Sequence, residues 1–263
     1  MKDLLISYIQ TELFWEDRQA NRDMLQKKIE SLGGNSHIIV LPEMFDTGFS
    51  MKPAGVKEQK AGQTLRWMQE LASRLEVVIC GSIMVAEAGK YFNRFHWTEP
   101  GGRVLTYDKK HLFRMGEEPV HYTGGTERTI IHYRGWNILP LICYDLRFPV
   151  WSGNCRTAEG FCYDLLIYVA NWPAPRREVW KTLLEARALE NQAFCIGVNR
   201  VGKDNNGLAY TGDSMVLNAK AEKLMRSAPN IEHEATVAIN KDELNSFREK
   251  FPVSMDWDAY KLE

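Results

Sequence analysis

The chain has 263 residues, of which 44% are hydrophobic and 25% are charged, and its formal net charge is -1. These values are typical of a globular protein with enough apolar residues for a core, and we expect a single domain over residues 1–263. The small net charge gives no reason to expect a nucleic acid or an anionic membrane as a partner. No apolar run approaches the ~18 residues that a membrane-spanning helix needs.

The cysteines bear on the compartment of the protein. They are odd in number and no two have the spacing C-x-x-C, so we expect neither a disulfide framework nor a structural zinc site. Acidic residues near the start and the lack of a small-residue cleavage site argue against a signal peptide. The sequence therefore predicts a cytoplasmic location in a reducing environment. The five cysteines are Cys80, Cys143, Cys155, Cys162 and Cys195.

Strand and helix patterns alternate along the chain. Segments rich in β-branched and aromatic residues predict strands, and apolar residues at helical spacing predict helices. The order of the two implies an α/β fold in which two central sheets are flanked by helices. The predicted strands are Leu4–Ile9, His37–Leu41, Val77–Val85, Tyr91–Trp97, Val104–Tyr107, Thr129–Tyr133, Ile138–Ile142, Leu165–Ala170, Phe194–Asn199, Tyr210–Asn218 and Ala235–Ile239; the predicted helices are Asp17–Leu32, Thr64–Leu75, Pro175–Gln192 and Glu243–Phe251.

Glycine and proline residues refine this prediction. Arg134-Gly135 and Asn206-Gly207 predict turns between paired strands. Pro140 lies inside a predicted strand and lacks the N–H of a ladder hydrogen bond, so we expect an edge position or a bulge there.

Three polar side chains follow apolar runs and could form a reactive site. Cys143 ends the run Ile138–Ile142, Glu43 ends HIIVLPE and Lys110 ends VLTYDKK. A cysteine nucleophile needs a base and a cation, because the thiolate is the reactive form. The pattern predicts a thiol hydrolase at the rim of a sheet. The alternatives are a structural cysteine, a helix-capping or ion-paired glutamate and a solvated lysine.

Four windows of the sequence resemble the nitrilase superfamily, the carbon–nitrogen hydrolases with a Glu–Lys–Cys triad. They are LPEMFDTGF (41–49), YDKKHLF (107–113), LICYDLRFP (141–149) and the segment 169–194, which contains R-A-x-E-N-Q. The resemblance implies a four-layer α-β-β-α sandwich with Glu43 as base, Lys110 as oxyanion donor and Cys143 as nucleophile. It also implies a homodimer that pairs through the face near the nucleophile.

The resemblance further implies a second glutamate beyond the lysine. Glu118 fits best, although its neighbour Glu117 stays an alternative; its role would be to hold Lys110 and orient the substrate nitrogen. The backbone N–H of Tyr144 would be a second oxyanion donor. No phosphate loop or dinucleotide motif occurs and the histidines do not cluster, so we expect no cofactor and no metal.

The string Y-D-L-R-F after the cysteine is similar to the omega-amidase-like branch of the family. The substrate implied is a 2-oxo acid monoamide, such as 2-oxoglutaramate or 2-oxosuccinamate, whose carboxylate calls for a positive charge. Arg147 is the candidate for that charge, with a structural arginine as the alternative. Asn171, Trp172 and Phe49 are candidates to line the substrate pocket.

Three alternatives for the function stay open at this stage. The first is hydrolysis of N-carbamoyl compounds or other small aliphatic amides. The second is a non-catalytic binding module on the same fold, although all three triad positions are occupied. The third is a cysteine–histidine protease, for which His111 would be the base.

Overall fold

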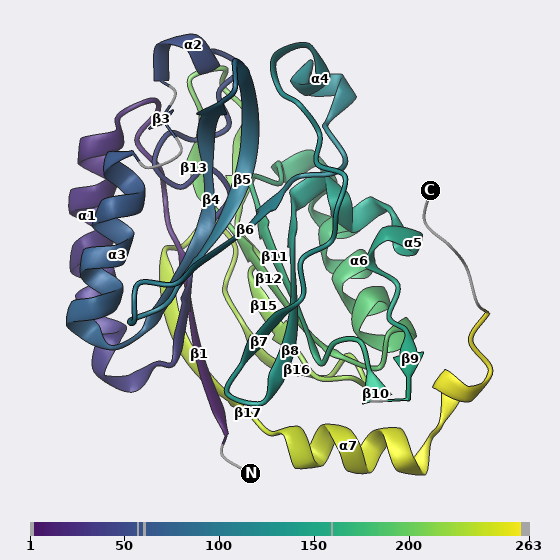
Figure 1. Ribbon diagram of the computed structural model, residues 1–263. Helices are drawn as coiled ribbons and strands as arrows, with labels where there is room; N and C mark the ends of the chain where they lie inside the picture. Colours follow the sequence, from purple (N-terminus) through teal and green to yellow (C-terminus); the bar gives the residue numbers. More distant parts are fainter. Residues whose placement is uncertain (1–2, 57, 60–61, 159, 259–263) are drawn as a thin grey trace.

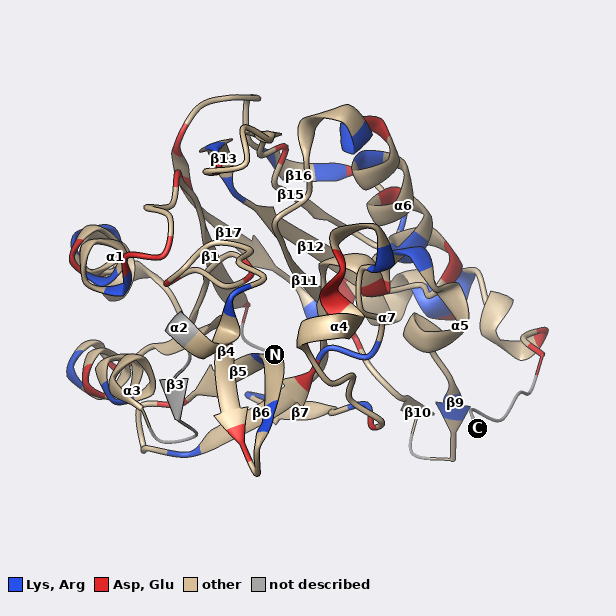
Figure 2. Ribbon diagram, turned by 90° about the horizontal axis from the view of Figure 1, so that it is seen from above, with Lys and Arg blue, Asp and Glu red and all other residues tan. Residues whose placement is uncertain are grey.

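Two β-sheets pack face to face, and helices cover their outer faces (Figure 1). The computed structural model describes residues 3–56, 58–59, 62–158 and 160–258. Seen from above, α1 (Arg18–Leu32) and α3 (Gln63–Leu75) lie on one side of the sheets and α6 (Arg177–Glu190) lies on the other (Figure 2). This is the four-layer α-β-β-α sandwich that the sequence predicts.

The first sheet has the strand order β17-β1-β2-β4-β5-β6, and β3 pairs with β4. Its strands are β1 (Leu4–Gln10), β2 (Ile38–Val40), β3 (Glu58–Gln59), β4 (Val78–Glu87), β5 (Lys90–Thr98), β6 (Val104–Asp108) and β17 (His233–Ile239). The second sheet has the order β16-β15-β12-β11-β8-β7. Its strands are β7 (Ile131–Tyr133), β8 (Trp136–Ile142), β11 (Leu165–Ala170), β12 (Phe194–Asn199), β15 (Met215–Leu217) and β16 (Lys223–Arg226).

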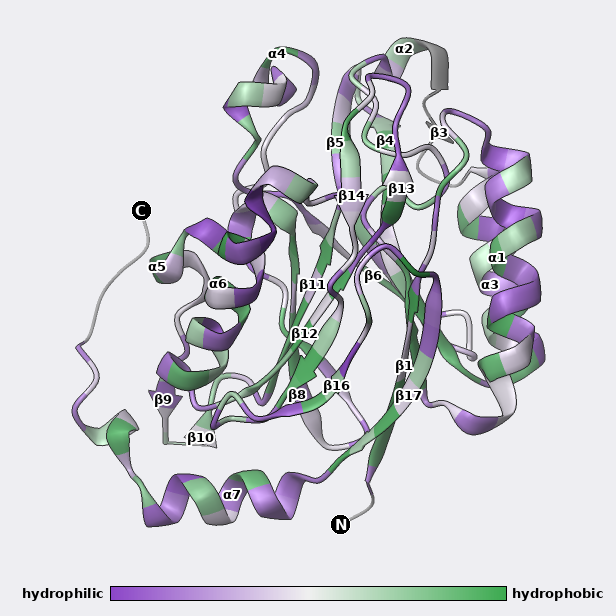
Figure 3. Ribbon diagram, turned by 180° about the vertical axis from the view of Figure 1, so that it is seen from behind, coloured by the Kyte–Doolittle hydropathy of each residue, from purple (hydrophilic) through white to green (hydrophobic). Residues whose placement is uncertain are grey.

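Shorter elements connect the sheets or lie at their ends. The helix α7 runs across the lower end of the sandwich (Figure 3). No helix within the described residues is long and apolar enough to cross a membrane. The remaining elements are α2 (Pro53–Val56), α4 (Glu118–His121), α5 (Pro149–Ser152), α7 (Lys241–Lys250), η1 (Gly33–Asn35), η2 (Arg114–Gly116), η3 (Cys143–Arg147), η4 (Ala174–Arg176), η5 (Val253–Met255) and the hairpins β9 (Arg156–Thr157) with β10 (Gly160–Phe161) and β13 (Val201–Lys203) with β14 (Ala209–Thr211).

The alternation of side chains along the strands builds two apolar layers. In β2, Ile38 and Val40 lie in the core between the sheets, whereas Ile39 faces the helices and packs in one cluster with Leu25 and Ile29 of α1. Burying one such side chain stabilises the fold by about 1.5–3 kcal/mol. The strands β11 and β12 of the second sheet are hydrophobic over most of their length, as expected for strands covered on both faces (Figure 3).

The predicted strand Tyr210–Asn218 is wrong as a single element. It divides into β14 and β15, which belong to different sheets. The division falls at Gly212 and Asp213, whose φ angles of 74° and 59° are incompatible with extended backbone. The residues at the break, Thr211-Gly212-Asp213-Ser214, are glycine or polar, and the prediction of one strand passes over this turn signal.

The expectation for Pro140 holds only locally. β8 is an interior strand that pairs with β11 on one side and β7 on the other, and Pro140 itself pairs with Ile167. On the other side, the pairing with β7 has already ended at Ile138 with Ile131. Pro140 therefore lies where that side of β8 is an edge, so its missing N–H leaves no gap in the ladder with β7.

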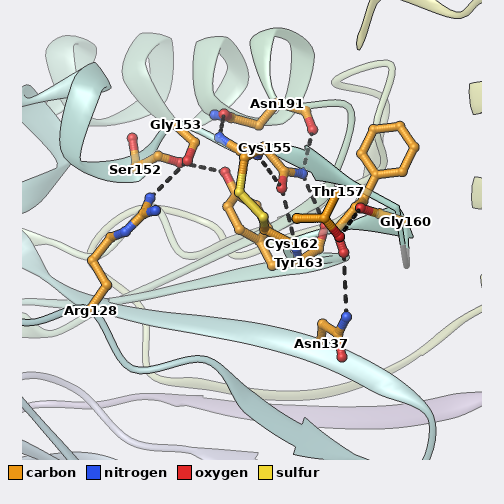
Figure 4. The surroundings of a disulfide bond; sticks show 12 residues. Arg128, Asn137, Ser152, Gly153, Cys155, Thr157, Gly160, Cys162, Tyr163 and Asn191 are labelled. Atoms are coloured by element: carbon orange, nitrogen blue, oxygen red, sulfur yellow. Dashed lines mark hydrogen bonds between the residues drawn. A yellow bond between two sulfur atoms is a disulfide. The ribbon is translucent and has the colours of Figure 1, made fainter. Parts of the chain in front are cut away.

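The expectation of no disulfide is wrong for Cys155 and Cys162, which are bonded to each other (Figure 4). The hairpin of β9 and β10 brings their Cα atoms to 5.2 Å, within the usual range of about 4.4–6.8 Å. The Cys162 N–H also donates to the Cys155 carbonyl at 2.8 Å. The spacing of seven residues did not show that the chain reverses between the two cysteines.

Candidate active site

Cys143 occupies a strained turn at the end of β8. It is the first residue of η3, and its φ angle of 45° places it in the left-handed region, which non-glycine residues rarely adopt. Strain of this kind persists only where surrounding contacts hold it, and it is frequent in active sites. The sequence pattern correctly placed this thiol directly after a buried strand.

Asp145 holds the turn in place. Its Oδ2 accepts from the Ile142 N–H at 3.0 Å and from the Tyr107 hydroxyl at 2.7 Å. Its Oδ1 accepts from the His111 N–H at 2.9 Å and lies 2.8 Å from His111 Nδ1. One fully buried carboxylate thus joins the segment after β6 to the segment that carries the nucleophile.

A buried ion cluster lies beside the thiol. Lys109 Nζ is 2.9 Å from Glu43 Oε1 and 2.9 Å from Glu118 Oε2, and all three side chains have no exposed surface. Asn93 Nδ2 donates to Glu43 Oε1 at 2.8 Å, and the Asn171 N–H donates to Glu43 Oε2 at 2.7 Å. These contacts fix both oxygens of Glu43 and satisfy the ammonium group.

The lysine in this cluster is Lys109, so the prediction of Lys110 is wrong. Lys110 Nζ instead lies over the ring of Trp151, 5.1 Å from its centroid. The cause is the strand alternation, because the Lys109 N–H donates to the Asn93 carbonyl and continues the β5–β6 ladder. Lys109 therefore follows the buried Tyr107 on one face of the strand, and the next residue points elsewhere.

The structure places Glu118 in the cluster and leaves its neighbour Glu117 exposed. Glu117 has a φ angle of 58° and precedes the short helix α4, whose first residue is Glu118. Glu118 Oε2 also accepts from the Phe113 N–H at 2.6 Å. The choice of Glu118 over Glu117 thus agrees with the geometry, and the partner of Glu118 is Lys109.

Burial and the neighbouring charges both shift the pKa of the thiol. Burial raises the pKa of Cys143 well above its ordinary value; the charge of Glu43 and a hydrogen bond to it add to this, while Lys109 opposes it. Burial also lowers the pKa of Lys109, but the charges of Glu118 and Glu43 outweigh it and raise that pKa overall. The pKa of Glu118 is raised by burial, against the pull of Lys109. The directions of these pKa shifts favour an ammonium group on Lys109 beside a protonated thiol on Cys143.

A cavity of about 290 Å³ opens beside Cys143. All of the residues predicted to bind substrate line it: Phe49, Tyr144, Arg147, Asn171 and Trp172. The sequence did not point to Asn93, Phe113, Arg176 or Tyr210. Asn93 contacts Glu43, and the other three line the cavity. Asn93 could have been found as the cross-strand neighbour of Lys109, whereas the others come together only through the tertiary fold.

His111 does not pair with the thiol. Its Nδ1 lies 2.8 Å from Asp145, and its ring stacks on Phe148 with centroids 3.8 Å apart. The cysteine–histidine protease alternative therefore has no geometric support. Within the described residues, no group of three or more His, Cys, Asp or Glu side chains could hold a metal ion.

Known proteins are similar to this chain in both sequence and fold. The carbon-nitrogen hydrolase family model matches residues 5–249. The omega-amidase YafV of Escherichia coli (strain K12) is 44% identical over 262 residues, covering all of both chains. A 2-oxoglutaramate amidase of Bacillus subtilis (strain 168) is 28% identical over 254 residues, covering 95% of this chain and 96% of the other.

A solved structure gives the same result. XC1258 from Xanthomonas campestris, described as a CN-hydrolase superfamily protein with an arsenic adduct in the active site, superposes with a TM-score of 0.98 at 40% identity and full coverage of both chains. The chain belongs to the carbon–nitrogen hydrolase family, the nitrilase superfamily that its sequence resembles.

Proposed function

We propose that this protein is an omega-amidase, which hydrolyses the terminal amide of a 2-oxo acid monoamide to the dicarboxylate and ammonia. The substrate would be 2-oxoglutaramate or 2-oxosuccinamate. The observation that carries the proposal is the buried cluster of Glu43, Lys109 and Glu118 beside the Cys143 thiol and an open cavity. The full-length similarity to an omega-amidase supports the choice of substrate class.

In the first half-reaction Glu43 acts as base. It takes the thiol proton as the Cys143 sulfur attacks the amide carbon, because the raised pKa of the thiol requires that the proton leave during the attack. The Lys109 ammonium and the Tyr144 N–H receive the oxyanion of the tetrahedral intermediate. Glu43 then returns the proton to the nitrogen. The C–N bond breaks, ammonia departs, and the acyl group stays on Cys143 as a thioester.

In the second half-reaction Glu43 removes a proton from water, which attacks the thioester carbonyl. The C–S bond breaks, the acid product leaves, and the proton returns to the sulfur. Glu118 keeps Lys109 charged and fixed, and it orients the substrate nitrogen. Arg147 binds the carboxylate at the far end of the substrate, while Phe49, Asn171 and Trp172 form the walls.

The proposal is tested by the ammonia released from 2-oxoglutaramate, compared with N-carbamoyl-β-alanine and a neutral aliphatic amide. We expect the 2-oxo amide to have the highest kcat/KM. Preference for either other compound would overturn the substrate assignment and leave the catalytic assignment intact. Hydrolysis of none of the three, with no acyl adduct on Cys143 in intact-mass spectra, would favour a binding module.

The assembly and compartment are also part of the proposal. Val150 of α5 and Leu189 of α6 are 55% and 53% exposed, and both elements contact η3, which carries Cys143. We expect this apolar face to form a homodimer, measurable by light scattering after gel filtration. We place the protein in the cytoplasm, so the Cys155–Cys162 disulfide of the structure would form only after the protein leaves that reducing compartment. Thiol trapping in intact cells should then find the two cysteines reduced, and capture of the pair as a disulfide would point to an oxidising compartment.

A further inference from the structure

Two arginine side chains line the cavity beside Cys143, and among the described residues neither forms a salt bridge. They are Arg147 of η3 and Arg176 of η4. Each guanidinium instead lies over an aromatic ring: Arg147 Cζ is 5.2 Å from the centroid of Trp172, and Arg176 Cζ is 5.2 Å from that of Phe113. Stacking of this kind holds a guanidinium while its in-plane N–H groups stay available to a ligand.

Trp172 connects the two arginines. Its ring supports Arg147, and its indole N–H donates to the Arg176 carbonyl at 2.8 Å. Trp172 is itself fixed, because its N–H donates to Asn199 Oδ1 at 2.8 Å and its carbonyl accepts from Asn199 Nδ2 at 3.0 Å. Only 3% of Trp172 is exposed. Trp172 thus contacts both residues, Arg147 at its guanidinium and Arg176 at its backbone.

The ring under Arg176 also contacts the nucleophile segment. Phe113 meets the ring of Tyr144 edge to face, with centroids 5.2 Å apart, and Tyr144 follows Cys143 directly. The Phe113 N–H donates to Glu118, which holds the catalytic lysine. Arg176 is therefore placed by the same residues that shape the reacting end of the cavity.

The acidic side chain that lines this cavity, Asp204, already has hydrogen-bond partners. Its Oδ1 accepts from the N–H groups of Asn206 and Leu208, and its Oδ2 accepts from the Tyr210 hydroxyl. The lining of the cavity therefore offers a ligand two sets of positively charged donors. The cavity thus suits a ligand group that only accepts hydrogen bonds, and its two guanidinium groups repel an ammonium group.

We propose that Arg176 is a specificity-determining residue, which together with Arg147 binds the carboxylate and the 2-oxo oxygen of the substrate. This inference rests on the proposed function and deepens it. A 2-oxo acid presents three acceptor oxygens to the two guanidinium groups. The corresponding amino acid amide replaces one of them with an α-ammonium and is disfavoured. Arg176 thus makes the enzyme select 2-oxoglutaramate over glutamine.

The first test separates binding of the acid end from catalysis. In Arg176→Gln we expect KM for 2-oxoglutaramate to rise at least about tenfold, as for a lost charged hydrogen bond, with kcat changed less than KM. Hydrolysis of pentanamide, a neutral amide of the same chain length, should change less than about twofold because it makes no such contact. Arg176→Lys should restore part of the loss.

A matched control removes the same charge nearby. Arg114 adjoins Phe113 in sequence, is exposed and does not line the cavity. Arg114→Gln should behave like the wild type toward both amides. An equal loss toward both amides in Arg176→Gln, or the same loss of 2-oxoglutaramate turnover in Arg114→Gln, would overturn the inference.

A second test does not depend on turnover. The dianion 2-oxoglutarate should protect Cys143 from alkylation by iodoacetamide, followed by intact mass, better than glutamate does. In Arg176→Gln the half-protecting concentration of 2-oxoglutarate should rise at least about tenfold. Failure of 2-oxoglutarate to protect the wild type would overturn the inference even if the amide is hydrolysed. Protection that depends on Arg176, without hydrolysis of 2-oxoglutaramate, would overturn the proposed function and with it the role of Arg176 in substrate selection, and would leave only binding of the 2-oxo acid by Arg176.

Discussion

The Lys109 ammonium lies 2.9 Å from Glu43 Oε1, and neither side chain has any exposed surface. A buried carboxylate is tolerated because the cation and two further donors, from Asn93 and Asn171, satisfy it. The same contacts keep Glu43 aimed at the thiol. Stability and the proposed chemistry therefore depend on one ion pair.

Replacing Lys109 should abolish most activity, whereas replacing Lys110 should not. Lys109→Met removes one oxyanion donor, which is typically worth about 2.7–4 kcal/mol, so kcat should fall by about 10²–10³. It also leaves two carboxylates buried without a cation, at a cost of about 3–5 kcal/mol in the free energy of unfolding. Lys110→Met is the matched control and should keep kcat and stability close to the wild type. A larger loss of kcat in Lys110→Met would restore the original prediction.

Removing the proposed nucleophile or base should impair acyl transfer to different degrees. Cys143→Ala should yield neither ammonia nor an acyl adduct in intact-mass spectra. Glu43→Gln keeps the thiol but loses the proton acceptor, so kcat should fall by about 10²–10⁴. Cys195→Ala, a buried cysteine of the second sheet, controls for the loss of a thiol and should form the adduct normally. An adduct in Cys143→Ala would place the nucleophile elsewhere.

The buried His96 should make the protein sensitive to acid. Burial lowers its pKa from 6.5 to about 4, and the charge of Arg94 adds to this. Between these two values the unfolded chain binds a proton that the folded protein does not, so stability falls as the pH falls. The full effect is on the order of 3 kcal/mol. Denaturant unfolding of His96→Phe between pH 7 and pH 4 should show a weaker pH dependence than the wild type.

An exposed histidine provides the comparison for that experiment. His132→Gln should keep the acid sensitivity of the wild type. If His96→Phe and the wild type lose stability in parallel below pH 6.5, His96 is not the group responsible.

The Cys155–Cys162 disulfide should contribute stability without contributing chemistry. It closes a short loop, and disulfides typically contribute about 2–4 kcal/mol, with short loops at the lower end. Cys155→Ser with Cys162→Ser should lower the free energy of unfolding by about 2 kcal/mol and leave kcat unchanged. Adding a reductant to the wild type should reproduce the loss, and the double variant should not respond to it.

Local patterns predicted much of the architecture and failed where tertiary contacts decide. The strands Leu165–Ala170 and Phe194–Asn199 match the prediction because both are continuous apolar runs, the second ending at Asn199. The lysine was misplaced by one residue, although the alternation of Leu105 and Tyr107 with Lys109 already favours the correct one. The role of Arg176 could not be predicted from the sequence, because its contacts with Phe113 and Trp172 form only in the folded chain.

The four hydrogen-bond contacts that Asp145 makes have a consequence for engineering this protein. Through Tyr107 and His111 it fixes the loop that carries the ammonium group, and through the Ile142 N–H it fixes the turn that carries the sulfur. Asp145 therefore fixes the positions of both the ammonium group and the sulfur. A substitution that shifts either loop is transmitted to the other, so altered substrate scope is better sought at the arginine end of the cavity than around the carboxylate.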